Sequence, residues 1–241
     1  MPSAPDAIVL CGGAGSRLRA VTGNAPKVMA TVGGRPFLEI LLRQLSRHGF
    51  RRVILAVAAH QHAIREHFGA RLFDLHLAYS PESVALGTGG SVRKALDLVE
   101  SDDVLIMNGD SYTELGFYSF LLDYHNSRAD VSVAVVSADG RDDCGSVVAD
   151  RDGKVLRFEE KKSQFLSRYV NAGIYLASKQ IILDVTPGLP VSLETELLPR
   201  WLAEGRLIRA FLCAGKCTDI GTPERYRSAQ QVLANVELEA T

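Results

Sequence analysis

The stretch Ala7-Ile8-Val9-Leu10-Cys11-Gly12-Gly13-Ala14-Gly15-Ser16-Arg17-Leu18 decides the fold class of this 241-residue chain. Five apolar residues followed directly by glycines are typical of a buried parallel strand that ends in a tight loop. The glycines leave backbone N–H groups room to turn towards an anion. Leu18 stands where a dinucleotide-binding loop has its third glycine, and no Gly-Lys-Ser/Thr closes a Walker loop. The glycines alone therefore fit an anion-binding loop and a plain strand-to-helix turn about equally well.

Strand and helix patterns alternate outward from this loop. Apolar runs predict strands at 53–57, 75–79 and 104–107. Helical periodicity is present at 36–45, 63–68 and 91–99. This alternation predicts an α/β fold: a Rossmann-like, mixed and mostly parallel sheet flanked by helices. Ligands of such sheets bind beyond the carboxyl ends of the strands, which here means the loops 12–17 and 108–110.

The second half of the chain is richer in short β segments. The β-branched run at 131–136 predicts a strand, and 145–150 with 153–158 predicts a hairpin that turns at Asp152-Gly153. Further strands are expected at 172–176 and 208–212. Thr222-Pro223-Glu224 is a typical helix start, with threonine as the cap and proline at the first position. No long linker interrupts the chain, so we expect one domain over 1–241.

Composition and charge exclude several classes of function. A formal net charge of -1 gives no bulk attraction to nucleic acid or to an anionic membrane. No apolar run reaches the roughly 18 residues that a membrane span needs, and the first six residues show no secretion signal. The four cysteines, Cys11, Cys144, Cys213 and Cys217, do not complete a zinc site and are expected to be free thiols. We therefore expect a cytoplasmic protein without nucleic-acid or membrane partners.

Two cations lie close to the glycine loop in the sequence. Arg17 follows the glycines directly, and Lys27 comes after Pro26. Cations beside an anion-cradling loop are what a triphosphate requires. Together, the run 12–18 and Pro26-Lys27 resemble the signature of the sugar-1-phosphate nucleotidyltransferases. The resemblance extends from Ile8 to about Tyr226 through further matching stretches: Leu86-Gly87-Thr88-Gly89-Gly90, Asn108-Gly109-Asp110, Phe158-Glu159-Glu160-Lys161, Asn171-Ala172-Gly173-Ile174-Tyr175 and Asp219-Ile220-Gly221-Thr222-Pro223-Glu224.

Two positions depart from that family's usual pattern. Ser16 stands where the family commonly has threonine, which keeps the hydroxyl, and Val28 stands where it commonly has proline. The second change alters the stiffness of the loop but leaves Lys27 in place. No hexapeptide repeat follows the last helix, so no appended acyltransferase or regulatory domain is expected. Within the family, the motifs look closest to the guanylyltransferases of D-glycero-α-D-manno-heptose 1-phosphate.

The resemblance implies a reaction and a division of the chain. A sugar 1-phosphate oxygen would attack the α-phosphate of a nucleoside triphosphate, with GTP and a heptose phosphate favoured, and pyrophosphate would leave. About 1–115 would be the nucleotide-binding half, and about 116–241 the sugar-phosphate-binding half with the C-terminal helix. Arg17 is expected on the leaving pyrophosphate and Lys27 between the phosphates. Asp110 and Asp219 are the expected Mg²⁺ ligands, although an aspartate at either position also suits a local turn.

The resemblance also nominates residues for the two substrates. The nucleotide-binding candidates are Leu10, Gly12, Gly13, Gly15, Ser16, Arg17, Glu82, Gly87, Thr88, Asn108 and Gly109. The sugar-phosphate candidates are Gly145, Glu160, Lys161, Asn171 and Gly173. In residues 87–90, small side chains would let the chain approach a flat base, and Thr88 or Ser91 would cap the next helix. Glu82 is either an acceptor for guanine N1 and N2 or a solvated acid, and residues 159–162 read alone are a solvated charge cluster.

Several alternatives remain open at this point. Enzymes that use mannose 1-phosphate with GTP, or hexose 1-phosphate with a thymidine or uridine triphosphate, would have the same catalytic residues. A regulatory homologue that binds nucleotide sugar without turnover would be expected to lose Arg17, Lys27 or a metal aspartate. A glycosyltransferase would show Asp-x-Asp, which Asn108-Gly109-Asp110 does not. His60-x-His62 is expected to be solvated, and Trp201 to pack in the core. The resemblance is compatible with a homodimer and with a role in capsule, lipopolysaccharide or surface-layer glycan.

Overall fold

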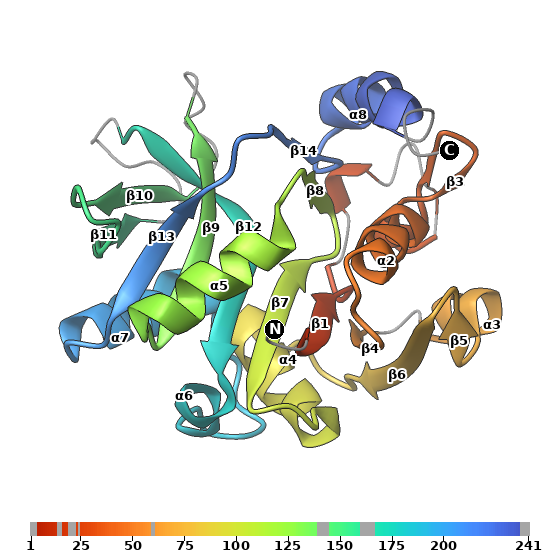
Figure 1. Cartoon of the computed structure of the whole chain (residues 1–241). Helices are drawn as coiled ribbons and strands as arrows, with labels where there is room; N and C mark the ends of the chain where they lie inside the picture. The colour runs from red at the N-terminus through yellow and green to blue at the C-terminus, as the bar shows by residue number, and fades with distance from the viewer. Residues whose placement is uncertain are drawn as a thin grey trace.

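A central sheet with helices on both faces organises the chain (Figure 1). The structure is a computed structural model that describes residues 4–13, 16–18, 23, 25–58, 61–138, 145–159 and 167–236. Among the helices in these ranges, none has both the length and the apolar character needed to cross a membrane. The architecture is the α/β sheet that the sequence predicts.

The first half of the sheet consists of parallel strands. They are β1 (Asp6–Leu10), β4 (Arg52–Val57), β6 (Leu75–Pro81) and β7 (Asp103–Asn108), in the order β7-β1-β4-β6. Ile8 of β1 pairs with Ile54 on one side and with Ile106 on the other. Strands buried on both faces are apolar along most of their length, which explains why β1, β4 and β7 do not alternate with polar residues. In β6, nearer the edge of the sheet, the exposed His76 lies between the buried Leu75 and Leu77. The short β5 (Arg71–Leu72) adds an antiparallel edge next to β6.

The second half of the sheet is built around the long strand β12 (Tyr169–Ser178), which runs antiparallel to β7. Its other neighbours are β9 (Val131–Ser137) and β10 (Ser146–Ala149), while β11 (Val155–Glu159) pairs with β10 and β13 (Ile208–Leu212) runs parallel to β9. The expected hairpin is present, and Gly153 at its turn has φ +83°. The register of β12 against β9 shifts between Asn171 and Tyr175. A bulge of this kind bends a strand and redirects its side chains.

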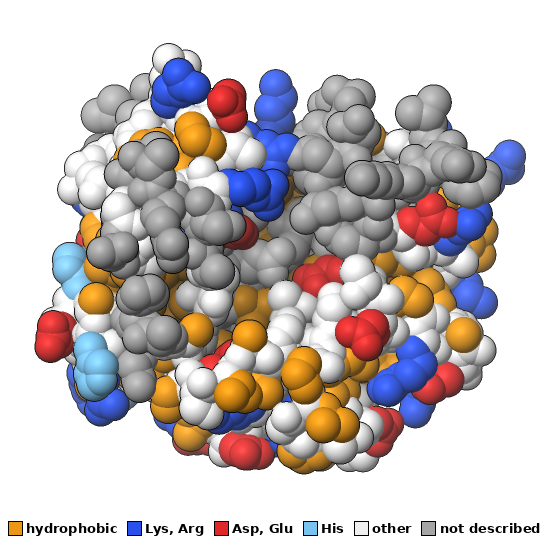
Figure 2. All heavy atoms as spheres, turned by 180° about the vertical axis from the view of Figure 1, so that it is seen from behind, with side chains coloured by type: hydrophobic (Ala, Val, Ile, Leu, Met, Phe, Trp, Pro, Cys, Tyr) orange, Lys and Arg blue, Asp and Glu red, His pale blue; other side chains and the backbone are white. Residues whose placement is uncertain are grey.

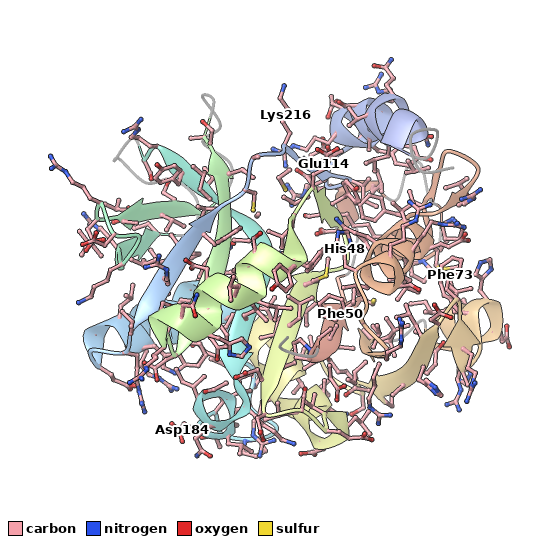
Figure 3. The ribbon with its side chains drawn as sticks, in the orientation of Figure 1. His48, Phe50, Phe73, Glu114, Asp184 and Lys216 are labelled. Carbon is pink, nitrogen blue, oxygen red and sulfur yellow. The ribbon has the colours of Figure 1, made fainter. Side chains whose placement is uncertain are left out.

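The helices divide between two hydrophobic clusters, one on each face of the sheet. The cluster that contains Val9 includes residues of α2 (Phe37–Arg47), α3 (Gln61–Phe68), α5 (Phe117–Ser127) and α8 (Pro223–Val236). The cluster that contains Ile8 includes residues of α4 (Gly87–Ala95), α6 (Lys179–Leu183), the π-helix η4 (Leu193–Leu197) and α7 (Leu198–Ala203). Trp201 is buried in the second cluster, as expected. On the first face, the rings of His48 and Phe50 lie 4.9 and 5.3 Å from the ring of Phe117, which joins α2 to α5 (Figure 3).

Two expectations about helix α4 were wrong. The helix begins at Gly87, earlier than the expected 91–99, and is followed by the 3₁₀ turn η3 (Leu96–Leu98). Thr88 and Ser91 therefore lie inside α4 and do not cap it. The Ser91 hydroxyl donates to the Gly87 carbonyl at 2.6 Å, whereas Thr88 Oγ1 accepts from the Leu193 N–H at 2.8 Å. Tertiary contacts with η4 thus hold a glycine-rich turn as helix against its low propensity.

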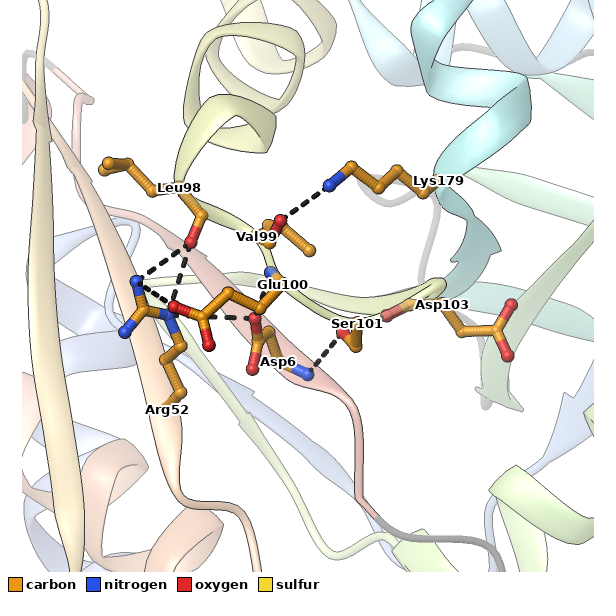
Figure 4. Close-up of polar contacts among 8 residues, drawn as sticks. All are labelled: Asp6, Arg52, Leu98, Val99, Glu100, Ser101, Asp103 and Lys179. Atoms are coloured by element: carbon orange, nitrogen blue, oxygen red, sulfur yellow. Dashed lines mark hydrogen bonds and ion pairs between the residues drawn. The ribbon is translucent and has the colours of Figure 1, made fainter.

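A polar network closes the amino ends of the parallel strands (Figure 4). Asp6 at the start of β1 accepts from the Glu100 N–H at 2.7 Å and lies 3.8 Å from the Arg52 guanidinium. Arg52 also donates to the Leu98 carbonyl and pairs with Glu100 at 3.1 Å. These groups satisfy one another, and the network ties β1, β4 and the segment before β7 together.

Basic and acidic side chains are interspersed over the face seen in Figure 2. That view shows the described side chains from behind, and both signs occur across it. The distribution agrees with the formal net charge of -1. A nucleic-acid surface is expected to be basic over a broad area, and the described part of this face is not.

Candidate functional site

A cavity of about 770 Å³ lies at the carboxyl ends of the parallel strands. Such a volume is within the range typical of small-molecule sites. The described residues that line it come from the ends of β1, β4, β6 and β7, and from the segments that follow them: Leu10, Cys11, Gly12, Gly13, Pro26, Lys27, Val28, Ala58, Ile64, Glu82, Ser83, Val84, Ala85, Leu86, Gly87, Thr88, Ser91, Asn108, Gly109 and Asp110. The cavity is therefore where an α/β sheet of this kind binds its ligand.

The glycines after β1 leave the floor of this cavity open. A methyl group built on Gly12 would have only Ala58 nearby, at 3.7 Å, and one built on Gly13 would have nothing within 4 Å. Packing against the protein therefore does not require glycine at either position. Glycine there leaves room for a ligand to approach the backbone closely. Gly15 lies outside the described residues, and so does the side chain of Ser16.

Lys27 and Asp110 form an ion pair at one end of the cavity. Lys27 lies in the 3₁₀ turn η2 (Lys27–Met29), and its Nζ is 2.5 Å from Asp110 Oδ2. The lysine side chain is 11% exposed and the aspartate 38%. A nearly buried ammonium beside a partly exposed carboxylate places a positive charge at the cavity wall.

A small antiparallel ribbon places Asp219 next to Asp110. It consists of β8 (Ser111–Thr113) and β14 (Cys217–Asp219), and Asp219 pairs with Ser111. The Ile220 N–H donates to the Asp110 carbonyl at 3.0 Å. Asp219 Oδ1 accepts from the Gly221 N–H at 2.8 Å, and Arg225 of α8 pairs with both carboxylate oxygens at 3.2 Å. The ribbon brings together the two aspartates that the sequence nominated.

The donor chemistry of these two aspartates fits Mg²⁺. Carboxylate oxygens are hard ligands, and Mg²⁺ commonly takes one or two of them together with water and substrate phosphate oxygens. A metal site built from protein alone would need three or more histidine, cysteine or acidic side chains close together. The described residues contain no such group. The pair therefore suits a metal shared with a phosphate better than a metal held by protein alone.

The C-terminal helix fastens the chain just after Lys27. The hydroxyl of Tyr226 and the amide of Gln230, both on α8, donate to the Thr31 carbonyl at 2.5 Å. Thr31 begins the hairpin of β2 (Thr31–Val32) and β3 (Arg35–Pro36), and the Gly33 N–H donates back to Gln230. Arg225, in the first turn of the same helix, pairs with Asp219 at the end of β14. The helix thus fixes η2 and the second aspartate relative to each other.

Glu82 lines the cavity and has one carboxylate oxygen without a hydrogen-bond partner among the described residues. Its Oε1 is shielded from solvent and has no hydrogen-bond partner, while Oε2 is 3.5 Å from the Leu86 N–H. An unpaired buried carboxylate oxygen costs about 1–3 kcal/mol or more. A ligand with N–H groups would satisfy it.

Packing within the protein requires glycines at the start of α4. Methyl groups built on Gly87 and Gly90 would lie 2.6 and 2.7 Å from the carbonyls of Val191 and Leu189, and one on Gly89 would lie 2.5 Å from Leu197. Small residues are needed here because the segment that leads into η4 packs directly on the turn. Gly87 and Thr88 still line the cavity.

One of the sugar-phosphate candidates, Gly173, lies against the cavity residue Asn108. Gly173 has φ +72°, and a methyl group on it would lie 2.5 Å from Asn108 Nδ2. The Gly173 N–H donates to Asn171 Oδ1 at 2.9 Å, and the Asn171 N–H donates to the Gly145 carbonyl at 2.8 Å. Gly145, Asn171 and Gly173 therefore form one connected group, while Glu160 and Lys161 lie outside the described residues.

Arg17 follows the glycine loop at a surface position. Arg17 lies in the 3₁₀ turn η1 (Ser16–Leu18) and is exposed, and the described lining does not include it. The next residue, Leu18, is fully buried and anchors the turn. Of the three catalytic candidates, Lys27 and Asp110 form an ion pair.

Sequence reasoning missed four residues at or near the site. Cys11 lines the cavity, and burial followed by the charge of Asp110 raises the pKa of its thiol far above the usual range. Arg225 pairs with Asp219, and Tyr175 and Glu194 connect Asn171 to Thr88. Tyr175 and Arg225 lie within or beside motifs already quoted, but Glu194 has only the pattern of an ordinary helical acid.

With this geometry in place, comparison with known proteins identifies the class. A family model described as nucleotidyl transferase matches residues 6–236. The chain therefore belongs to the nucleotidyl transferase family.

Individual relatives show which members of the family this chain is similar to. The chain is 31% identical to the D-glycero-alpha-D-manno-heptose 1-phosphate guanylyltransferase of Aneurinibacillus thermoaerophilus, over 95% of this chain and 98% of that protein. It is 34% identical to the mannose-1-phosphate guanylyltransferase of Mycobacterium tuberculosis, over 92% of this chain and 62% of the length of that relative. The crystal structure of HddC from Yersinia pseudotuberculosis superposes with a TM-score of 0.84 at 30% identity, covering 95% of this chain and all of that one. The same protein is also known complexed with GMP-PN.

Proposed function

We propose that this protein transfers GMP from GTP to D-glycero-α-D-manno-heptose 1-phosphate and releases pyrophosphate. The observation that carries the proposal is the Lys27–Asp110 pair at the end of a nucleotide-sized cavity, next to Asp219. Relatives of the full length of this chain have that activity in their names. In the proposed reaction, a phosphate oxygen of the sugar phosphate bonds to the α-phosphorus of GTP, and the bond to the β-phosphate oxygen breaks.

Charge neutralisation is the main task of the protein in such a transfer. Nucleotidyl transfer needs positioning and electrostatic stabilisation more than covalent help. Lys27 is held by Asp110 and would supply positive charge to the phosphates. Asp110 and Asp219 would hold Mg²⁺, which when bound would neutralise phosphate oxygens. Arg17 is proposed to meet the leaving pyrophosphate from the turn that follows the glycine loop.

Base choice is assigned to Glu82. Its unpaired Oε1 lies where β6 ends at the cavity, and guanine offers two neighbouring donors, N1–H and the N2 amino group. Uracil and thymine offer a single ring N–H beside carbonyl oxygens, so a carboxylate would repel them. Gly12, Gly13, Gly87 and Thr88 are proposed to surround the base and ribose, and Leu10, Asn108 and Gly109 to form the strand ends beneath the phosphates.

The acceptor is proposed to bind beside Asn108, at Gly145, Asn171 and Gly173, with Glu160 and Lys161 on its hydroxyls and phosphate. A second candidate acceptor is mannose 1-phosphate, because the relative with 34% identity is named for it. Three described cysteines are free thiols, which agrees with a proposed cytoplasmic location. A homodimer is proposed for the assembly.

Pyrophosphate release with Mg²⁺ tests the proposal. GTP, ATP, CTP, UTP and dTTP are each offered with the heptose phosphate, mannose 1-phosphate and glucose 1-phosphate, to the wild type and to Glu82→Gln. Release confined to GTP with the heptose phosphate is expected, and glutamine should lower kcat/KM for GTP by about ten- to a hundredfold because its amide group faces guanine donors. Release with mannose 1-phosphate alone would favour the second candidate. An unchanged base preference in the variant would exclude Glu82 as the base reader.

A further inference from the structure

A chain of hydrogen bonds between side chains runs from the nucleotide cavity to the acceptor candidates. Thr88 Oγ1, at the cavity, donates to Glu194 Oε2 at 2.5 Å. Glu194 Oε1 accepts from the Tyr175 hydroxyl at 3.2 Å, and that hydroxyl accepts from Asn171 Nδ2 at 2.6 Å. Asn171 continues to Gly173, which contacts Asn108. The chain therefore begins and ends at residues proposed for two different substrates.

Glu194 is the centre of this chain, and its environment is unusual for a glutamate. Glu194 is only 9% exposed, and its partner Tyr175 is completely buried. Its two carboxylate oxygens accept from three hydroxyl groups, those of Thr88, Tyr175 and Ser192. Acidic residues are rarely buried unless partners satisfy them, and hydrogen bonds to a charged group are stronger than those between neutral groups. Any shift of one donor would leave the carboxylate short of a partner.

The backbone around Glu194 is equally constrained. Glu194 lies in a π-helix, η4, and such turns are rare and frequent at functional sites. The segment before it packs on Gly87, Gly89 and Gly90 with no room for a methyl group. At the other end, Asn171 and Tyr175 flank the irregular register of β12. Both ends of the hydrogen-bonded chain are therefore rigidly linked to the backbone that carries them.

We propose that Glu194 is a positioning residue that couples the nucleotide loop at Thr88 to the acceptor residue Asn171 through Tyr175. This inference rests on the proposed function, because it needs a nucleotide at Thr88 and a sugar phosphate at Asn171. A nucleotide that fixes α4 at its first turn holds Thr88, and through Glu194 and Tyr175 it holds the Asn171 amide in its acceptor-binding orientation. Each substrate then binds more tightly when the other is present, by the same factor.

Binding measurements with an unreactive nucleotide test the coupling. The probe is α,β-methylene-GTP with Mg²⁺, which cannot release pyrophosphate, and its Kd is measured by calorimetry without and with saturating sugar 1-phosphate. The sugar phosphate is the one that the wild type turns over. For the wild type, the sugar phosphate is expected to lower the Kd by about fivefold or more. In Glu194→Gln and Tyr175→Phe, the factor should fall below about twofold, since each variant removes one link of the chain.

Glu196→Gln is the matched control. Glu196 lies on the same π-helix, is exposed, and accepts only from the Ser192 N–H, at 2.8 Å, among its described contacts. It should keep the wild-type factor. Fluorescence of Trp201, the sole tryptophan, reports whether each variant is folded. If Glu194→Gln does not fold, Tyr175→Phe alone tests the coupling. An equal factor in all variants, or a factor of one in the wild type, would overturn the coupling while pyrophosphate release stands. No release by the wild type with any substrate pair would instead overturn the proposed function.

Discussion

The two ends of the parallel strands differ in how their polar groups are satisfied. At the amino ends, Asp6, Arg52 and Glu100 bond to one another and to backbone groups (Figure 4). At the carboxyl ends, Glu82 keeps a buried oxygen without a partner, and the glycines after β1 face open space. Between the two ends, β1, β4 and β7 are almost wholly buried, while β6 has the exposed His76.

We infer from this contrast that the amino ends of the sheet serve stability, while the carboxyl ends are the proposed binding site. Stability alone would favour pairing Glu82 or replacing it with an apolar residue, because an unsatisfied buried group destabilises the fold. At a binding site a ligand can satisfy such a group, and sites of this kind trade stability for function. Replacing an aspartate should therefore lower activity more than stability at the carboxyl ends, and stability more than activity at the amino ends.

The largest effect is expected from Asp110→Asn. Asparagine keeps the size of the side chain and can still accept from Lys27, but it removes the charge that would bind Mg²⁺ and orient the lysine. We expect kcat/KM for pyrophosphate release to fall by about 10²–10³. The side chain is 38% exposed, so water screens the ion pair and the free energy of unfolding should change by less than about 1 kcal/mol. Steady-state kinetics and urea unfolding measure the two quantities.

Asp6→Asn is the matched control for that substitution. It makes the same chemical change at the amino ends of the strands, far from the cavity residues, and should leave kcat/KM within about twofold, since surface-network changes seldom alter a distant site. Equal losses of activity in the two variants would mean that the ends do not have separate roles. A full-activity Asp110→Asn enzyme would remove Asp110 from the proposed metal site.

The parallel half of the fold could be read from the sequence because its signal is local. Apolar runs such as Val104–Met107, each followed by a turn, need no knowledge of distant contacts. Helix α5 was not anticipated, although its first turn begins after Gly116. The start of α4 was misplaced because η4, far along the chain, holds the glycines of that turn as helix.

Site residues that lie in a sequence motif could be predicted. Residues that reach the site only through contacts with distant parts of the chain could not. Lys27 and Asp110 were nominated from their motifs and form a pair in the structure. Asp219 was nominated as the partner of Asp110 by the family resemblance alone, because the ribbon that joins them has only three residues in each strand and gives no periodic signal. Glu194 gave no signal either, since its burial depends on Tyr175 and Thr88 from two other elements. The roles of the nominated residues remain predictions.

An intermediate effect is expected at the amino ends, and there it concerns stability. Asp6→Ala removes the acceptor of the Glu100 N–H and the partner of Arg52, and the side chain it removes is 13% exposed. The free energy of unfolding should fall by about 1–3 kcal/mol, measured in urea by Trp201 fluorescence. Asp6→Asn should recover part of this loss, because its carbonyl can still accept from Glu100. No loss in either variant would mean that the network of Figure 4 contributes little to stability.

The smallest effect concerns the cysteines and follows from their burial. Cys11 borders the cavity yet is buried, and burial and then the Asp110 charge raise the pKa of its thiol; burial raises the pKa of Cys213 to about 12. Only the thiolate reacts with iodoacetamide, so at pH 8 both should be alkylated more than about a hundredfold slower than in the unfolded chain. Peptide mass spectrometry after timed alkylation measures the rates. Because the folded state keeps both thiols protonated, stability should be highest below about pH 8.5, the ordinary thiol pKa, and fall as pH rises above it. Alkylation of Cys11 at the unfolded rate would show that the open end of the sheet reaches further into the core than its burial indicates.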